Sequence, residues 1–144
     1  MATIAHSLLH RKLCAHFYAY ETQFGFFALI EPRMQIVSGA RYRLPDLTLC
    51  PKPLPAGRIV TTPPWAVLEV LSPDDQWPAQ LKRFRDYAGI GVRHIVLLDR
   101  ETFLAHRFED DSLIKTEFRH FELPTGHVPF DTGAIFRELA AELG

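Results

Sequence analysis

Residues 65–73 read Trp65-Ala66-Val67-Leu68-Glu69-Val70-Leu71-Ser72-Pro73. Apolar residues crowd this short run and a proline ends it, which is typical of a buried strand. Glu69 lies inside the run, and a carboxylate is costly to bury unless a positive partner meets it. The stretch therefore predicts a core strand whose carboxylate has a positively charged partner.

A second carboxylate stands in a similar setting. Residues 43–49 read Arg43-Leu44-Pro45-Asp46-Leu47-Thr48-Leu49, which we interpret as a neighbouring buried strand. Two carboxylates on neighbouring strands repel each other unless a divalent cation lies between them. Asp46 and Glu69 are therefore candidate ligands of a metal ion, and the pair points to metal-dependent chemistry.

The chain after Glu69 predicts a strand–helix–strand unit. Residues 78–89 have helical spacing, and residues 94–98 form a strong apolar strand. A helix that connects two strands favours parallel pairing between them. We therefore expect the two strands to be parallel neighbours. The predicted core face of the helix comprises Leu81, Phe84 and Ala88.

The remaining segments complete a mixed pattern of helices and strands. The expected elements are a helix over residues 3–20, strands over residues 26–30 and 35–37 with a turn at Ser38-Gly39, a hairpin with strands near 103–108 and 113–121, and a last helix capped by Asp131. This order predicts a single α/β (α+β) domain over residues 1–144, with one central mixed sheet flanked by helices.

Composition narrows the class of protein. The chain of 144 residues is 47% hydrophobic and 23% charged, with a net charge of -1, so no global basic field attracts nucleic acid.

Cys14 and Cys50 are interpreted as reduced thiols. No apolar stretch reaches the about 20 residues that span a membrane, and charged residues interrupt the first apolar stretch, unlike a signal peptide. We infer a cytoplasmic protein.

Three motifs in order resemble the PD-(D/E)XK nuclease superfamily, and most closely the bacterial Uma-type family of restriction endonuclease-like proteins. The motifs are Arg41-Tyr42-Arg43-Leu44-Pro45-Asp46, then Leu68-Glu69-Val70-Leu71-Ser72-Pro73-Asp74-Asp75, then Tyr87-Ala88-Gly89-Ile90-Gly91-Val92-Arg93-His94 running into Leu97-Leu98-Asp99. The resemblance covers residues 4–100. It implies a restriction-endonuclease-like fold and metal-dependent hydrolysis of DNA phosphodiester bonds.

The resemblance also implies a role for each matching position. Asp46 and Glu69 would hold Mg²⁺ or Mn²⁺ together with the backbone carbonyl of Val70, and Glu31 on the preceding strand would add a carboxylate. Such a metal ion lowers the pKa of a bound water and shields the charge of the scissile phosphate. Arg43 is the expected phosphate contact. A homodimer that binds DNA is a further implication.

The sequence does not decide whether Lys82 or its neighbour Arg83 is the catalytic cation. The helical lysine of the family stands four residues before the tyrosine, which corresponds to Arg83 when counted from Tyr87, and Lys82 is one residue earlier. At about 100° per residue, the two side chains flank the predicted core face at similar angles. An arginine neutralises phosphate charge but does not carry a proton. The sequence favours Lys82 over Arg83 by a small margin.

Two other functions compete with a DNA endonuclease. The first is a catalytically inactive module of the same fold that binds nucleic acid or self-associates, which the displaced lysine and the near-neutral charge favour. The second is a metal-dependent hydrolase of another phosphate ester. Metal affinity and cleavage of DNA, RNA and small phosphodiesters distinguish the three.

Overall fold

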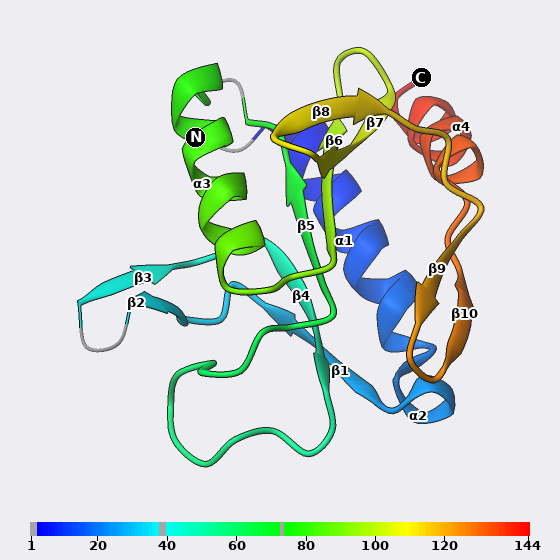
Figure 1. Cartoon of the computed structure of the whole chain (residues 1–144). Helices are drawn as coiled ribbons and strands as arrows, with labels where there is room; N and C mark the ends of the chain where they lie inside the picture. Colours follow the sequence, from blue (N-terminus) through cyan, green and yellow to red (C-terminus); the bar gives the residue numbers. More distant parts are fainter. Residues whose placement is uncertain (1–2, 38–39, 73) are drawn as a thin grey trace.

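The computed structural model describes residues 3–37, 40–72 and 74–144, so the expected turn at Ser38-Gly39 and the strand-ending Pro73 lie outside the described residues. Its elements are α1 (Ile4–Tyr18), α2 (Glu21–Phe24), β1 (Phe26–Ile30), β2 (Met34–Val37), β3 (Arg41–Arg43), β4 (Leu47–Pro51), β5 (Ala66–Val70), α3 (Trp77–Gly89), β6 (His94–Asp99), β7 (Leu104–Glu109), β8 (Ser112–Lys115), β9 (His120–Leu123), β10 (Gly126–Pro129) and α4 (Thr132–Leu143). The mixed α/β class predicted from the sequence is confirmed (Figure 1).

Six strands form one mixed sheet in the order β1-β4-β5-β6-β7-β8. At its centre β5 and β6 are parallel, with Glu69 opposite Leu97, as the crossover through α3 predicts. The other neighbours in this sheet are antiparallel. The central mixed sheet is therefore confirmed.

Two further strand pairs lie outside the six-stranded sheet. One is the β2–β3 hairpin, which projects from the body of the molecule (Figure 1). The other is the β9–β10 pair, which corrects the predicted strand near 113–121. That strand ends at Lys115 in β8, and residues from His120 onward pair with β10 instead. Asp131 caps α4 as predicted, since its side chain accepts the N–H of Ala134 at 3.0 Å.

The sheet is buried on both faces, which explains the continuous apolar runs of its central strands. One core contains Leu68 and Val70 of β5 together with residues of α1 and α4, and the other contains Val67 of β5 together with residues of α3. Side chains alternate between the faces of a strand. Glu69 therefore lies on the face of β5 that α3 covers.

Helix α3 packs on the sheet with a face that differs from the prediction. Phe84 is fully buried as expected, and Leu81 is partly buried, but Ala88 is exposed and Tyr87 is fully buried. The prediction of Ala88 as a core residue was wrong because it counted only apolar side chains. Tyr87 combines a large apolar ring with a hydroxyl, which donates to the buried carboxylate of Glu69 at 3.0 Å.

Two smaller expectations about the chain concern its cysteines and its membrane spans. Cys14 and Cys50 are free thiols, as the sequence predicts. Within the described ranges, none of the helices is long and apolar enough to cross a bilayer.

Truncating Phe84 tests how α3 is held on the sheet. Its side chain is fully buried and packs against Phe108 with ring centres 5.7 Å apart, so Phe84→Ala is expected to lower the free energy of unfolding by about 3–5 kcal/mol. Trp77→Ala is the matched control in the same helix. The Trp77 side chain is 53% exposed, so its loss should change stability by only about 1 kcal/mol. Urea denaturation measures both, and equal losses would contradict the packing described.

Candidate functional site

Asp46 and Glu69 lie side by side at the ends of paired strands. Leu47 of β4 pairs with Leu68 of β5, so the residue before Leu47 faces the residue after Leu68. The backbone N–H of Asp46 donates to Oε1 of Glu69 at 3.3 Å, and the backbone N–H of Val70 donates to Oδ2 of Asp46 at 2.8 Å. The two carboxylates that the sequence singles out are therefore neighbours in space.

The strand expected over residues 43–49 is divided at Pro45. Arg43 ends β3, and Asp46 occupies a bend immediately before β4. Proline has no N–H for a strand ladder and restricts the residue before it, which explains the break. The bend frees the Asp46 side chain from the alternation of a strand and lets it turn towards Val70.

The cation beside the carboxylates is Arg83. Its Nη2 atom lies 3.2 Å from Oε2 and 3.5 Å from Oε1 of Glu69, and it also reaches the carbonyl oxygen of Leu44 at 3.5 Å. Lys82, which the sequence favours narrowly, is exposed on the helix. The difference follows from the burial of Tyr87, because Arg83 shares the flank of α3 that carries this tyrosine.

Burial dominates the electrostatics of the site. It raises the pKa of Glu69 to about 8, with a further contribution from the nearby Asp46, while Arg83 and the hydroxyl of Tyr87 partly offset the shift. Burial also raises the pKa of Asp46 above its ordinary value. For Arg83, burial acts against the charged form, yet Glu69 and Tyr87 raise its pKa, so the guanidinium stays protonated. One arginine faces two carboxylates, and the proton that Glu69 keeps at neutral pH removes the second negative charge.

The other residues predicted for the site lie around this centre. Val70 is buried at the end of β5. Glu31 is exposed, and its backbone N–H donates to the carbonyl oxygen of Asp46 at 3.1 Å. Arg43, the expected phosphate contact, forms an ion pair of 2.8 Å with Asp86 of α3.

Histidines of α1 approach the site, which sequence reasoning did not foresee. The ring Nε2 of His10 donates to the carbonyl oxygen of Asp46 at 3.0 Å. A groove of about 370 Å³ lies beside this contact, and its lining consists of His6, Ser7, His10, Arg11, Cys14, Ile30 and Glu31. The spacing of His6 and His10 is visible in the sequence, but two histidines four residues apart on a helix, with no Cys or carboxylate partner evident, indicate only a surface pair. Only the packing of α1 on the sheet links it to Asp46.

The donor set of this centre fits a hard divalent cation. Mg²⁺ is usually held by one or two carboxylates, keeps several waters, and binds substrate phosphates directly. Asp46 and Glu69 offer carboxylate oxygens within one small region, where burial raises the pKa of both groups and a cation would compete with their protons. Across the described part of the chain, no group of three or more His, Cys, Asp and Glu side chains is gathered to hold a metal. A cation here would therefore rely on backbone carbonyl, water or phosphate oxygens for most of its remaining ligands.

Comparison with known proteins identifies the family and the fold. The chain matches the family model described as "Uma2: Putative restriction endonuclease" over residues 1–133. It is similar to the crystal structure of a "putative nuclease belonging to DUF820 from Anabaena variabilis ATCC 29413", with a TM-score of 0.76 and 17% identity, covering 96% of this chain and 84% of that chain. A likeness to the DrdV–DNA complex solved by cryoEM has a TM-score of only 0.42 and 14% identity, over 94% of this chain and 13% of that chain. The comparison with curated proteins gives no match.

Glu69 is expected to make the metal-free protein less stable as the pH rises. Its pKa is about 8 in the folded chain against 4.5 as the ordinary value, so between these pH values the folded chain holds a proton that the unfolded chain has lost. Stability therefore falls as the pH rises from about 4.5 to about 8. Urea denaturation in chelator across this range measures the fall.

Glu69→Gln should flatten this decline, because the amide does not titrate. Glu117→Gln, at an exposed position of the chain, should keep the decline of the wild type. A decline that is equally steep in the Glu69→Gln protein would contradict the assignment of the raised pKa to Glu69.

Proposed function

This chain belongs to the Uma2 family, and on that premise we propose that it is a metal-dependent endonuclease that hydrolyses DNA phosphodiester bonds. The observation that carries the proposal is the contact of Asp46, Glu69 and Arg83 at the end of β4 and β5. Two carboxylates and a fixed cation are the groups that phosphodiester hydrolysis needs. The expected homodimer and cytoplasmic location remain predictions within this proposal.

We assign the metal-binding role to the two carboxylates, with the carbonyl of Val70 as a third ligand and Glu31 at the rim. The chemistry that bound Mg²⁺ or Mn²⁺ supplies is a water of lowered pKa and neutralised charge on the phosphate. Asp46 and Glu69 must lose their protons to bind it, and their desolvated position strengthens the attraction for a cation. Tyr87 keeps Glu69 in place through its hydroxyl.

We assign to Arg83 the stabilisation of the extra negative charge that develops on the phosphate. Its guanidinium is fixed by Glu69 and by the carbonyl of Leu44, and a fixed donor needs no reorganisation when charge appears. Because an arginine stays protonated, it does not take the proton of the attacking water. Its role is therefore electrostatic. Lys82, being exposed, is assigned no contact with the reacting phosphate.

An inactive module of the same fold is the alternative that one observation favours. Both oxygens of Glu69 already accept hydrogen bonds from protein groups, so the site is partly satisfied by Arg83 and Tyr87 without a cation. Calorimetric titration with Mg²⁺ combined with a cleavage assay distinguishes the two. The inactive module would bind DNA without cutting it in any divalent metal.

Removing either carboxylate is expected to slow the nicking of supercoiled plasmid in Mg²⁺ severely. Several kcal/mol of charge stabilisation depend on the bound ion, and each 1.36 kcal/mol is a factor of ten in rate. Asp46→Ala and Glu69→Ala should therefore each lower the rate by about two to three orders of magnitude. Glu117→Ala, an exposed glutamate, is the control and should nick like the wild type. Equal nicking by all four proteins would exclude this site.

The two helical cations are expected to differ sharply in their effect on nicking. Arg83→Ala removes a donor fixed at the site and should lower the rate by about 10²–10³. Lys82→Ala removes an exposed charge and should leave the rate within about twofold. Thermal denaturation of each variant shows whether the fold is retained. A large loss with Lys82→Ala and none with Arg83→Ala would reverse the assignment.

A further inference from the structure

Residues 32–68 carry a net positive charge because this segment contains few acidic residues. The segment holds five of the 16 lysines and arginines of the chain but only one, Asp46, of its 17 acidic residues. The rest of the chain has eleven basic and sixteen acidic residues. The net charge of -1 therefore hides a strongly basic region. This region comprises β2, β3, β4 and the proline-rich loop at 52–64.

Most of these positive charges are not neutralised within the molecule. Arg41 and Arg43 share the single carboxylate of Asp86, which leaves one charge in excess. Among the residues that the structure describes, no carboxylate forms an ion pair with Arg33, Lys52 or Arg58. All three of these residues are exposed.

Aromatic rings hold two of the unpaired cations in place. The guanidinium carbon of Arg33 lies 4.2 Å from the centre of the Tyr42 ring, and the ammonium of Lys52 lies 4.5 Å from the centre of the Phe27 ring. A cation over an aromatic face gains about 0.5–1 kcal/mol at an exposed site. These side chains are therefore partly ordered before a ligand arrives.

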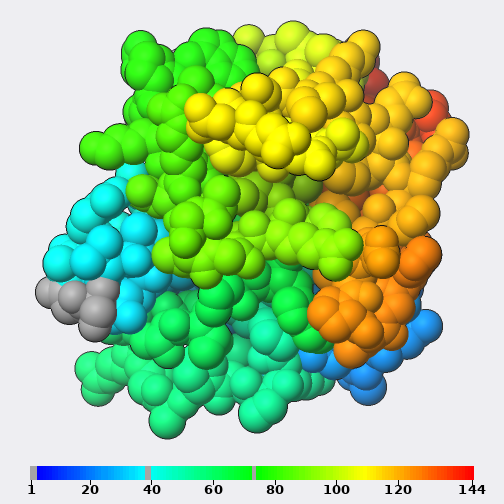
Figure 2. Space-filling model, viewed as in Figure 1, coloured from blue at the N-terminus to red at the C-terminus, as the bar shows by residue number. Residues whose placement is uncertain are grey.

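The hairpin and the loop form one continuous surface. The N–H of Val60 donates to the carbonyl of Arg33 at 2.8 Å, and the N–H of Gln35 donates to the carbonyl of Val60 at 2.9 Å, so the loop is joined to β2. Figure 2 shows the cyan hairpin and the blue-green loop adjacent on one side of the molecule. We call this the basic surface, made up of residues 33–37, 40–43 and 52–62.

The basic surface starts at the candidate site. β1 and β4 are paired, with Ile30 opposite Leu47, and the β2–β3 hairpin is the connection between them. Its first strand therefore begins just after Glu31, and its second ends just before Asp46. A long ligand that reaches Asp46 has this hairpin as its nearest neighbour.

We propose that the basic surface binds the phosphate backbone of duplex DNA and holds it across the site, an inference that rests on the proposed function. Cations without carboxylate partners bind phosphates with release of counterions. Arginine and lysine contacts to phosphates fix the position of a duplex and carry no sequence information directly. One face of Tyr42 is covered by Arg33, so this ring is less available for stacking on unpaired bases, which favours a duplex over a single strand.

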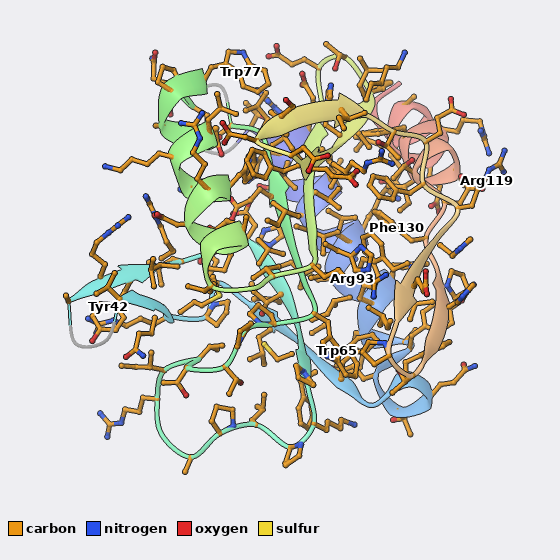
Figure 3. The ribbon with its side chains drawn as sticks, viewed as in Figure 1. Tyr42, Trp65, Trp77, Arg93, Arg119 and Phe130 are labelled. Atoms are coloured by element: carbon orange, nitrogen blue, oxygen red, sulfur yellow. The ribbon has the colours of Figure 1, made fainter. Side chains whose placement is uncertain are left out.

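Two matched triple variants of the full chain test the proposal. The first is Arg33→Gln, Lys52→Gln and Arg58→Gln, and the second is Arg93→Gln, Lys115→Gln and Arg119→Gln. Both remove two arginines and one lysine from exposed positions, so they change the net charge equally. Figure 3 shows Arg119 at the edge of the molecule opposite Tyr42 of the hairpin, and Arg93 nearer the middle, also away from the hairpin.

Binding of a fluorescent duplex is measured by anisotropy in chelator, between about 50 and 200 mM salt. The first triple should weaken binding at least tenfold and reduce the slope of log affinity against log salt by about 2–3, since three phosphate contacts are lost. The second triple variant should leave the affinity within about twofold and the salt slope nearly unchanged. Exchanging each of the three residues for the other basic type (Arg33→Lys, Lys52→Arg, Arg58→Lys) should retain most of the affinity.

The proposal is overturned if the unmodified chain does not bind the duplex, if both triples weaken binding equally, or if the first triple has no effect. A first triple that impairs binding only of a single-stranded oligonucleotide also overturns it. Because the assay contains no divalent metal, it is independent of cleavage. A chain that binds through this surface but never cuts DNA would contradict the proposed activity alone.

Discussion

The structure depends on the burial of Glu69 next to Asp46 with Arg83 as the nearby cation. Burial disfavours both carboxylates in their charged form, and the nearby Asp46 makes ionisation of Glu69 harder still. A single guanidinium at 3.2 Å relieves only part of this penalty. The proton that Glu69 keeps at neutral pH relieves the rest, and we propose that a divalent cation takes the place of this proton.

The rest of the fold holds these groups in position. The parallel pairing of β5 with β6 places β5 inside the sheet, where α1 and α3 cover its two faces and Glu69 lies under α3. The burial of Tyr87 sets the rotation of α3, and that rotation brings Arg83 to the carboxylate. On the opposite face, α1 packs on the sheet and directs His10 to the backbone of Asp46. The site is thus defined by backbone positions on three separate elements.

Much of this could be predicted from the sequence because it depends on local pattern. The sequence alone predicts the apolar run around Glu69, the crossover after it and the pair of carboxylates. Burial and parallel pairing follow from composition and connection length. The rotation of α3 could not be predicted, because it depends on the Tyr87 hydroxyl, which reaches the buried carboxylate of Glu69 across the packing interface. The same limit applies to His10 and to the β9–β10 pair, whose partners are distant in the chain.

The central claim is that Asp46 and Glu69 together hold one divalent cation. A crystal structure of the protein with Mn²⁺, with the ion located by its anomalous scattering, tests this most directly. We expect one ion that contacts both carboxylates, with Arg83 still beside Glu69 or turned towards an open phosphate position. An Mn²⁺-soaked crystal would contradict this assignment if Arg83 and Tyr87 still form their hydrogen bonds with Glu69 and no ion lies between the carboxylates.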